Sequence, residues 1–113
     1  MTEEQFFRFC QENDSINFER NEMGDIIKME PTGSEIERFN FDIGLELGNW
    51  NRKSNSGVVF GNDGGFTLAN KAVRSPDAAF ISRFRYEALP ISDRKMFAHI
   101  CSDFTIEILS ESD

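Results

Sequence analysis

Hydrophobic residues recur every three or four positions in two stretches of the chain, the period that is typical of amphipathic helices. In residues 2–13 the apolar stripe consists of Phe6, Phe9 and Cys10. In residues 34–53, a longer stretch, the stripe consists of Ile36, Phe39, Ile43, Leu47 and Trp50. Such stripes stabilise helices when they are buried against another element. We therefore predict two helices that pack on a sheet through these faces.

Shorter stretches alternate apolar and polar residues, or are apolar for several positions, as expected for strands. Residues 16–29 contain a turn at Gly24 and predict a hairpin in which this glycine adopts a positive φ. Residues 57–68 contain an Asp-Gly-Gly turn and predict a second hairpin. Two apolar runs, around Ala79 and Ile106, predict the central strands. The pattern as a whole predicts an α/β fold, with a mixed, mostly antiparallel sheet flanked by the two helices.

Each of the two central runs is associated with one acidic residue. Asp77 follows Pro76 and directly precedes the run around Ala79, whereas Glu107 lies within the run around Ile106. Two carboxylates on adjacent strands can share one divalent cation, because hard oxygen ligands suit Mg²⁺ and Mn²⁺. The alternative is that each acid is solvated or paired at a strand end, as is common for single acidic residues.

The order of residues around these acids points to a known class of nuclease. Pro76-Asp77, a hydrophobic strand and then Glu107-Ile108-Leu109 resemble the PD-(D/E)xK nuclease signature. An ordered series along most of the chain resembles, more specifically, the Uma2 family of restriction-endonuclease-like fold. The resembling segments are residues 18–21, Gly24, 26–33, Leu47, 50–51, 57–60, 65–68, 74–78 and 104–107, followed by Ser110 and Asp113.

This resemblance implies a metal-dependent endonuclease that acts on DNA. It implies that Asp77, Glu107 and the backbone carbonyl of Ile108 hold one Mg²⁺ or Mn²⁺ ion. It also places Glu19 near the metal, as a third candidate catalytic acid. The interpretation of Glu19 as an ordinary exposed glutamate stays open.

A lysine normally assists the attacking water and stabilises developing charge in such sites. The lysine position of the signature is occupied here by Leu109. In the family, the strand that carries the glutamate leads into a lysine-bearing helix. The sequence ends soon after Leu109, so we expect it to represent the front portion of a Uma2 protein, with little activity. Lys71, Arg74 and Lys95 are the alternative sources of the missing charge.

Length and composition predict one globular domain over residues 1–113, because 39% of the residues are hydrophobic and twelve are Phe. Twenty acidic against twelve basic residues give a net charge of −8, which opposes binding to a polyanion. A second hypothesis therefore stays open. In it, the chain is a catalytically inactive remnant, or a protein-binding module, that retains the nuclease fold.

The remaining features exclude several other classes. No apolar run is long enough to span a membrane, and the start of the chain is acidic, unlike a secretory signal. Cys10 and Cys101 form no CxxC motif, so we expect reduced thiols and a cytoplasmic location. The single histidine, His99, is expected to be a surface or core residue. We expect DNA as the partner, no membrane, and a homodimer as one option for the assembly.

Overall fold

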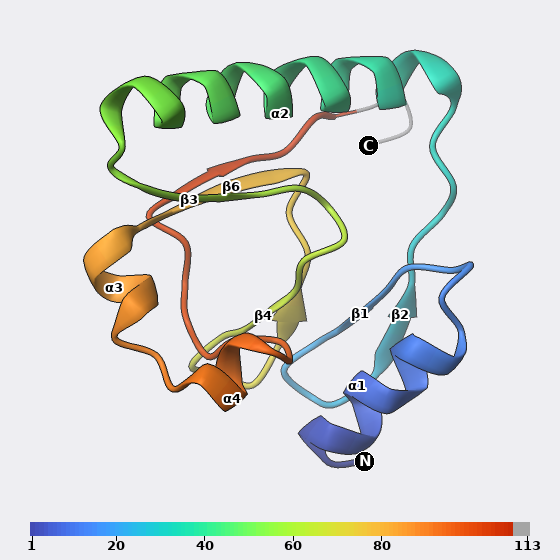
Figure 1. Ribbon diagram of the computed structural model, residues 1–113. Coiled ribbons are helices and arrows are strands. Elements are labelled where there is room, and N and C mark those ends of the chain that lie inside the picture. Colours follow the sequence, from blue (N-terminus) through green and yellow to red (C-terminus); the bar gives the residue numbers. More distant parts are fainter. Residues whose placement is uncertain (110–113) are drawn as a thin grey trace.

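The computed structural model describes residues 1–109, in which the strands form two antiparallel sheets flanked by helices (Figure 1). The predicted α/β class is therefore confirmed, but two sheets replace the single one. One sheet has the order β2 (Ile26–Lys28), β1 (Phe18–Arg20), β5 (Val73–Arg74), β4 (Phe66–Thr67). The other has the order β3 (Gly57–Phe60), β6 (Ala78–Ser82), β7 (Phe104–Ile106). The helices are α1 (Glu3–Glu12), α2 (Ser34–Ser54), α3 (Arg83–Glu87) and α4 (Ile91–Arg94).

The first predicted hairpin is present and the second is not. Strands β1 and β2 pair around a turn in which Gly24 has a φ of 89°, as expected. Strand β3, however, pairs with β6 over its whole length, whereas β4 pairs with β5. The Asp-Gly-Gly turn favours a local reversal, but β4 is only two residues long. Pairing with the longer apolar strand β6 overrides that local preference.

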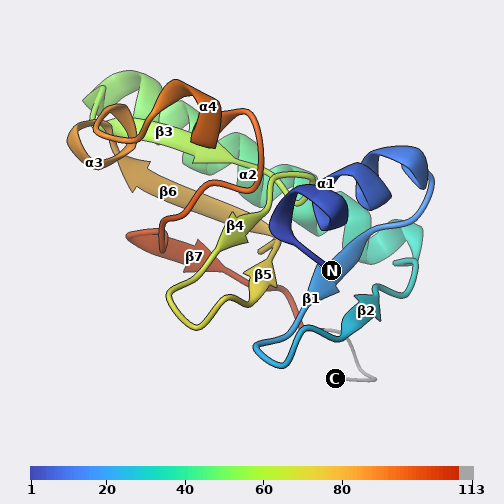
Figure 2. The same cartoon turned by 90° about the horizontal axis from the view of Figure 1, so that it is seen from below.

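Strand β6 is central in its sheet, as predicted, whereas β7 lies at the edge of the described sheet. Figure 2 shows β3, β6 and β7 running side by side in that order. Ala78, Ala79 and Ile81 are at most 1% exposed. The prediction that the strand around Ile106 is also central is wrong, because β7 pairs only with β6 among the described strands. A short apolar run cannot by itself distinguish an edge strand from an inner one.

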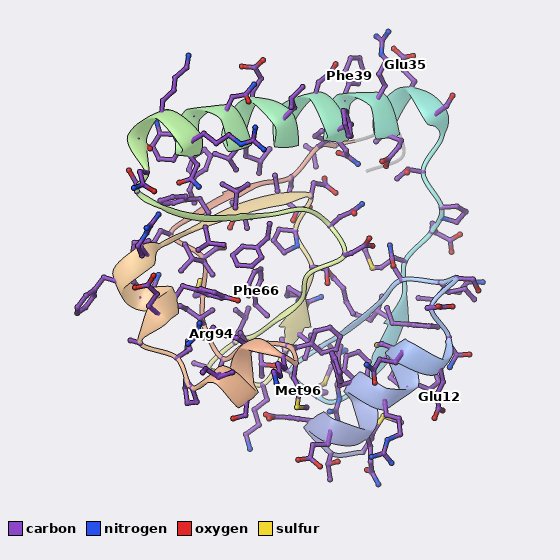
Figure 3. The ribbon with its side chains drawn as sticks, in the orientation of Figure 1. Glu12, Glu35, Phe39, Phe66, Arg94 and Met96 are labelled. Carbon is purple, nitrogen blue, oxygen red and sulfur yellow. The ribbon has the colours of Figure 1, made fainter. Side chains whose placement is uncertain are left out.

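The core lies where the two sheets meet. It contains Phe66, Ala79, Ile81, Ala98 and Ile100, against which Phe60, Tyr86 and Leu89 pack. Figure 3 shows Phe66 in the interior, on the side of the molecule where Arg94 and Met96 of the α4 region lie. The N–H of Thr67 donates to the carbonyl oxygen of Ala98 at 2.8 Å, which ties β4 to the segment after α4. This segment therefore closes the core between the sheets.

The connection from α2 to β3 depends on a close approach of two backbones. The side-chain amide of Asn51 donates to the carbonyl of Gly57 at 2.9 Å and accepts from its N–H at 3.0 Å. Between them, Asn55 ends the helix with a φ of 51°. A Cβ atom at Gly57 would lie 2.1 Å from the carbonyl oxygen of Ile81. Only glycine fits there, and the pairing of β3 with β6 depends on it.

The predicted burial of the α2 stripe is only partly correct. Phe39 and Trp50 are 41% and 47% exposed. Ile36, Ile43 and Leu47 are half-buried. Figure 3 shows Phe39 projecting from the outer side of the helix. A sheet of three short strands is too small to cover a helix of 21 residues.

Helix α1 is fixed by a capping box at Thr2 and by one buried side chain. Phe6 is fully buried, and its ring lies 5.6 Å from that of Phe97. His99 contacts α1 from the segment after α4. Its Nε2 lies 2.8 Å from a carboxylate oxygen of Glu3, and its Nδ1 lies 2.6 Å from one of Asp93. The histidine therefore links α1 to α4, a role that its sequence position did not indicate.

Two further observations concern the cysteines and the apolar character of the helices. Cys10 and Cys101 are free thiols, as predicted from their spacing. Within residues 1–109, no helix is both long enough and apolar enough to cross a membrane.

Urea denaturation can measure how much more a truncation destabilises the protein at a core position than at a half-buried one. Ile81→Ala removes a side chain with no exposed area, so it should reduce the free energy of unfolding by about 2–5 kcal/mol. Leu47→Ala removes a half-buried side chain and should cost only about 1–2 kcal/mol. Equal losses for the two variants would contradict this description of α2.

The His99 contacts predict a pH-dependent stability. The hydrogen bond to Asp93, followed by that to Glu3, raises the pKa of His99 above its usual value of 6.5, although partial burial opposes this. The stabilisation is therefore complete below pH 6.5 and is lost as the pH rises through the higher pKa of the folded protein. Thermal melts between pH 6 and 9 should show this loss in the wild type, whereas His99→Gln should lack it. Parallel pH profiles for the two proteins would refute the role of the histidine.

Candidate active site

The register of β6 and β7 brings Asp77 and Glu107 to opposite positions. Ala78 pairs with Ile106, so one residue further the same register places Asp77 across from Glu107. The Oδ2 atom of Asp77 accepts a hydrogen bond from the N–H of Ile108 at 2.7 Å. Opposite residues of an antiparallel pair project to the same face. The three residues that the sequence suggested as metal ligands therefore lie together at one end of β6.

Local sequence explains why β6 begins at this point. Pro76 has no N–H to donate to a strand partner, so pairing starts only after it. Pro76 itself is buried, whereas Asp77 is half-buried, with its carboxylate bonded across to the other strand. The Pro-Asp sequence thus places an acidic side chain at the first position where the sheet can form.

Glu19 reaches the same region from the other sheet. Its Oε2 atom accepts from the backbone N–H of Ser75 at 2.8 Å, and its Oε1 atom lies 3.2 Å from Nη1 of Arg74. The side chain of Glu19 is 13% exposed. Both carboxylate oxygens of Glu19 are thus engaged in holding the segment that leads into Asp77.

The electrostatic environment of Glu107 joins these acids into one site. Partial burial is the main cause that raises the pKa of Glu107, and the negative charges of Asp77 and then Glu19 raise it further. The backbone amide of Asp77 opposes these effects in part. The region around these acids therefore carries an excess of negative charge, which a bound cation would compensate.

The donor atoms fit a small divalent cation in type, although not as a complete cage. Among residues 1–109, no group of three His, Cys, Asp or Glu side chains is arranged to hold a metal. Because Glu19 is occupied by Arg74 and Ser75, the carboxylates that remain are those of Asp77 and Glu107. Magnesium is commonly bound by one or two carboxylates and several waters. The oxygen atoms present are compatible with such a site.

Arg74 is the cation that contacts Glu19, the third candidate acid. Of the three cations that the sequence offered as substitutes for a lysine, Arg74 is tied to the site through Glu19. Lys71 lies in the turn between β4 and β5, with a φ of 72°, and Lys95 is exposed after α4. Leu109, at the expected lysine position, is 77% exposed.

A groove beside the acids contains a residue that the sequence interpretation missed. The groove has a volume of about 300 Å³ and extends from α2 past the end of β3 to Asp77. Asn40 lines it and is only 8% exposed, and its Oδ1 atom has no hydrogen-bond partner within the described residues. The available signal was helical spacing, since Asn40 lies four residues after Ile36 and three before Ile43.

An α/β fold of antiparallel sheets flanked by helices is compatible with the restriction-endonuclease-like class of proteins. The chain belongs to the Uma2 family, whose model, described as "Putative restriction endonuclease", matches residues 3–113. This assignment supports a nuclease and DNA as its substrate. No curated protein matches the chain.

The raised pKa of Glu107 predicts an effect on stability that has a definite sign. Folding disfavours its ionised form, so the wild type loses stability as the pH rises above the ordinary value of 4.5. Glu107→Gln removes this penalty and should be more stable than the wild type at pH 7, with a smaller difference at pH 4. Glu46→Gln, at an exposed position of α2, is the matched control. A pH-independent difference for Glu107→Gln, measured in urea melts, would refute the electrostatic account.

Proposed function

We propose that the protein is a Mg²⁺- or Mn²⁺-dependent endonuclease that hydrolyses phosphodiester bonds of DNA. The Uma2 assignment supports the nuclease class. The pairing of Asp77 with Glu107 across β6 and β7, fixed by the bond from Ile108, is the observation on which the metal dependence rests.

In this proposal Asp77, Glu107 and the backbone carbonyl of Ile108 hold the metal ion. A bound divalent ion supplies Lewis acidity and lowers the pKa of a water molecule. The Ile108 N–H engages only one oxygen of Asp77, which leaves the other as a ligand. Because nearby negative charge raises the pKa of Glu107, binding of a cation would favour its ionised form.

Glu19 and Arg74 have supporting roles in the proposed site. Glu19 is the third acid, and it positions the segment before Asp77 through the N–H of Ser75. Its ion pair holds the guanidinium of Arg74 at the Glu19 carboxylate. A guanidinium binds phosphate oxygens well, and we assign to Arg74 the charge stabilisation that a lysine provides in related sites. Because Arg74 is already paired with Glu19, we expect this stabilisation to be weak and cleavage to be slow.

Two exposed apolar residues of α2 that line the groove beside Asp77 favour a second candidate function, a protein-binding module that retains the fold. Phe41 is 69% exposed and Leu45 is 51% exposed, and they lie one helical turn apart. Exposed apolar residues that cluster in this way often mark a contact with another protein. Under this alternative the acids would be structural, and the protein would bind no divalent metal.

Metal binding discriminates between the two candidates. Asp77→Asn removes the negative charge but keeps an oxygen that can accept from the N–H of Ile108. It should therefore fold normally and bind Mn²⁺ at least about tenfold more weakly than the wild type, since a ligand charge is lost. Calorimetric titration with Mn²⁺ measures this, and Glu46→Gln is the control for a lost surface charge. Equal Mn²⁺ affinity in Asp77→Asn and the wild type would exclude the proposed site.

Cleavage provides the functional readout of the same site. The wild type should nick supercoiled plasmid DNA slowly in the presence of Mn²⁺, and Asp77→Asn should not. Arg74→Gln should reduce the rate by less than about 10²-fold, the usual cost of one fully effective stabilising group, because Arg74 is already paired with Glu19, and it should not prevent Mn²⁺ binding. An absence of both cleavage and Mn²⁺ binding in the wild type would favour the protein-binding alternative.

A further inference from the structure

The C-terminal end of α2 leads into β3, and the short helix α3 follows β6, the strand that pairs with β3, so both lie on the same side of the molecule (Figure 1). The N–H of Arg83 donates to the carbonyl oxygen of Ser56 at 3.1 Å, and its guanidinium donates to the side chain of Asn55. These bonds place Arg83 near Arg52 and Lys53, which lie in the last turn of α2. All three cations are exposed, and together they are called the basic end.

An exposed aromatic residue directly follows Arg83 in the chain. Phe84, the next residue of α3, is 85% exposed, the largest value among the exposed large apolar side chains of residues 1–109. Burial of aromatic surface is strongly favourable, so an exposed phenylalanine offers free energy to a partner that covers it. A combination of cations and an exposed aromatic ring is typical of surfaces that bind single-stranded nucleic acid.

Helix stabilisation explains the basic end only in part. Arg52 and Lys53 interact favourably with the negative end of the α2 dipole. Arg83, however, is the first residue of α3, where a positive charge gains nothing from the dipole. Arg85 is paired with Asp103 at 2.7 Å, whereas no ion pair to an acid forms at the basic end within the described residues.

The basic end and the candidate active site lie at opposite ends of one strand. Asp77 directly precedes β6 and Arg83 directly follows it. Six residue steps at about 3.3 Å separate these two positions by about 20 Å. A stacked DNA strand spans this distance with about six nucleotides, at about 3.4 Å for each. One strand can therefore contact both regions.

We propose that the basic end binds the phosphate backbone of a DNA strand and that Phe84 stacks on an unpaired base of that strand. The inference rests on the proposed function, because it states where the DNA substrate of the candidate active site is held. It also resolves the apparent conflict with the net charge of −8, since local cations, not the net charge, contact the phosphates.

Metal-independent binding tests the basic end separately from catalysis. Fluorescence anisotropy would follow a labelled single-stranded DNA of about 20 nucleotides in EDTA, over a series of salt concentrations. In the test variant, Arg52, Lys53 and Arg83 are all replaced by Gln. Its affinity should fall at least about tenfold, and the slope of log affinity against log salt should decrease by about 2, at about 0.7 for each phosphate that the variant no longer neutralises.

A matched control removes the same number of positive charges elsewhere. Arg8 on α1, Lys28 on β2 and Lys95 after α4 are exposed, and all three are replaced by Gln. This control should bind the single strand with nearly wild-type affinity and slope. Thermal melts of both triple variants would establish that the helices are retained.

Phe84→Ala tests the stacking interaction. It should weaken binding of the single strand about fivefold or more, and it should change binding of a fully paired duplex much less. An equal effect on the two DNA forms, or none, would overturn the assignment of an unpaired base to Phe84.

The outcomes separate this inference from the proposed function. Equal reductions in affinity for the two triple variants would show that binding follows overall charge, which overturns the basic end but leaves the nuclease proposal intact. If the wild type binds neither single-stranded nor duplex DNA, with or without Mn²⁺, the proposed function fails, and this inference fails with it.

Discussion

Strand β6 pairs with β3 along one edge and with β7 along the other, and the positions of the functional groups follow from this arrangement. Ile81 is completely buried, so the register of the strand is firmly specified. A shift by one residue would turn Ile81 out of the core and move Asp77 away from Glu107. The same pairing that builds the core therefore also sets the spacing of the two acids. Stability and the candidate chemistry depend on one set of backbone hydrogen bonds.

Local features of the fold could be predicted from the sequence because each depends on neighbouring residues. The helical period located α1 and α2, and the glycine at position 24 located the first hairpin turn. The partner of β3 could not be predicted, because a turn signal describes only the residues beside it. The exposure of Phe39 was equally hidden, since it depends on how far the sheet extends beneath α2.

In the candidate site, too, the local features could be predicted from the sequence and the long-range contacts could not. The Pro-Asp sequence and the acid in the last apolar run indicated Asp77 and Glu107 directly. The ion pair between Glu19 and Arg74, by contrast, joins residues that are 55 positions apart, and spacing carries no information about such a pair. The groove with Asn40 was missed because an asparagine in a helix is usually expected at the surface. Its position on the apolar stripe of α2 was the signal that it is buried. The resemblance to a family, not the periodicity, was what placed Glu19 near the other acids.

The amide of Asn51 holds the two backbone groups of Gly57, and this interaction has a consequence for the motion of α2. The helix is fastened to the sheet at its C-terminal end, whereas at its other end Gly33 provides no side-chain cap. A helix held in this way opens from its unfastened end, because few contacts must break there. Amide hydrogen exchange should therefore be fastest in the first turns of α2 and slowest near Asn51. Because Glu37, Asn40 and Phe41 of α2 line the groove beside Asp77, such an opening of the helix would widen the groove.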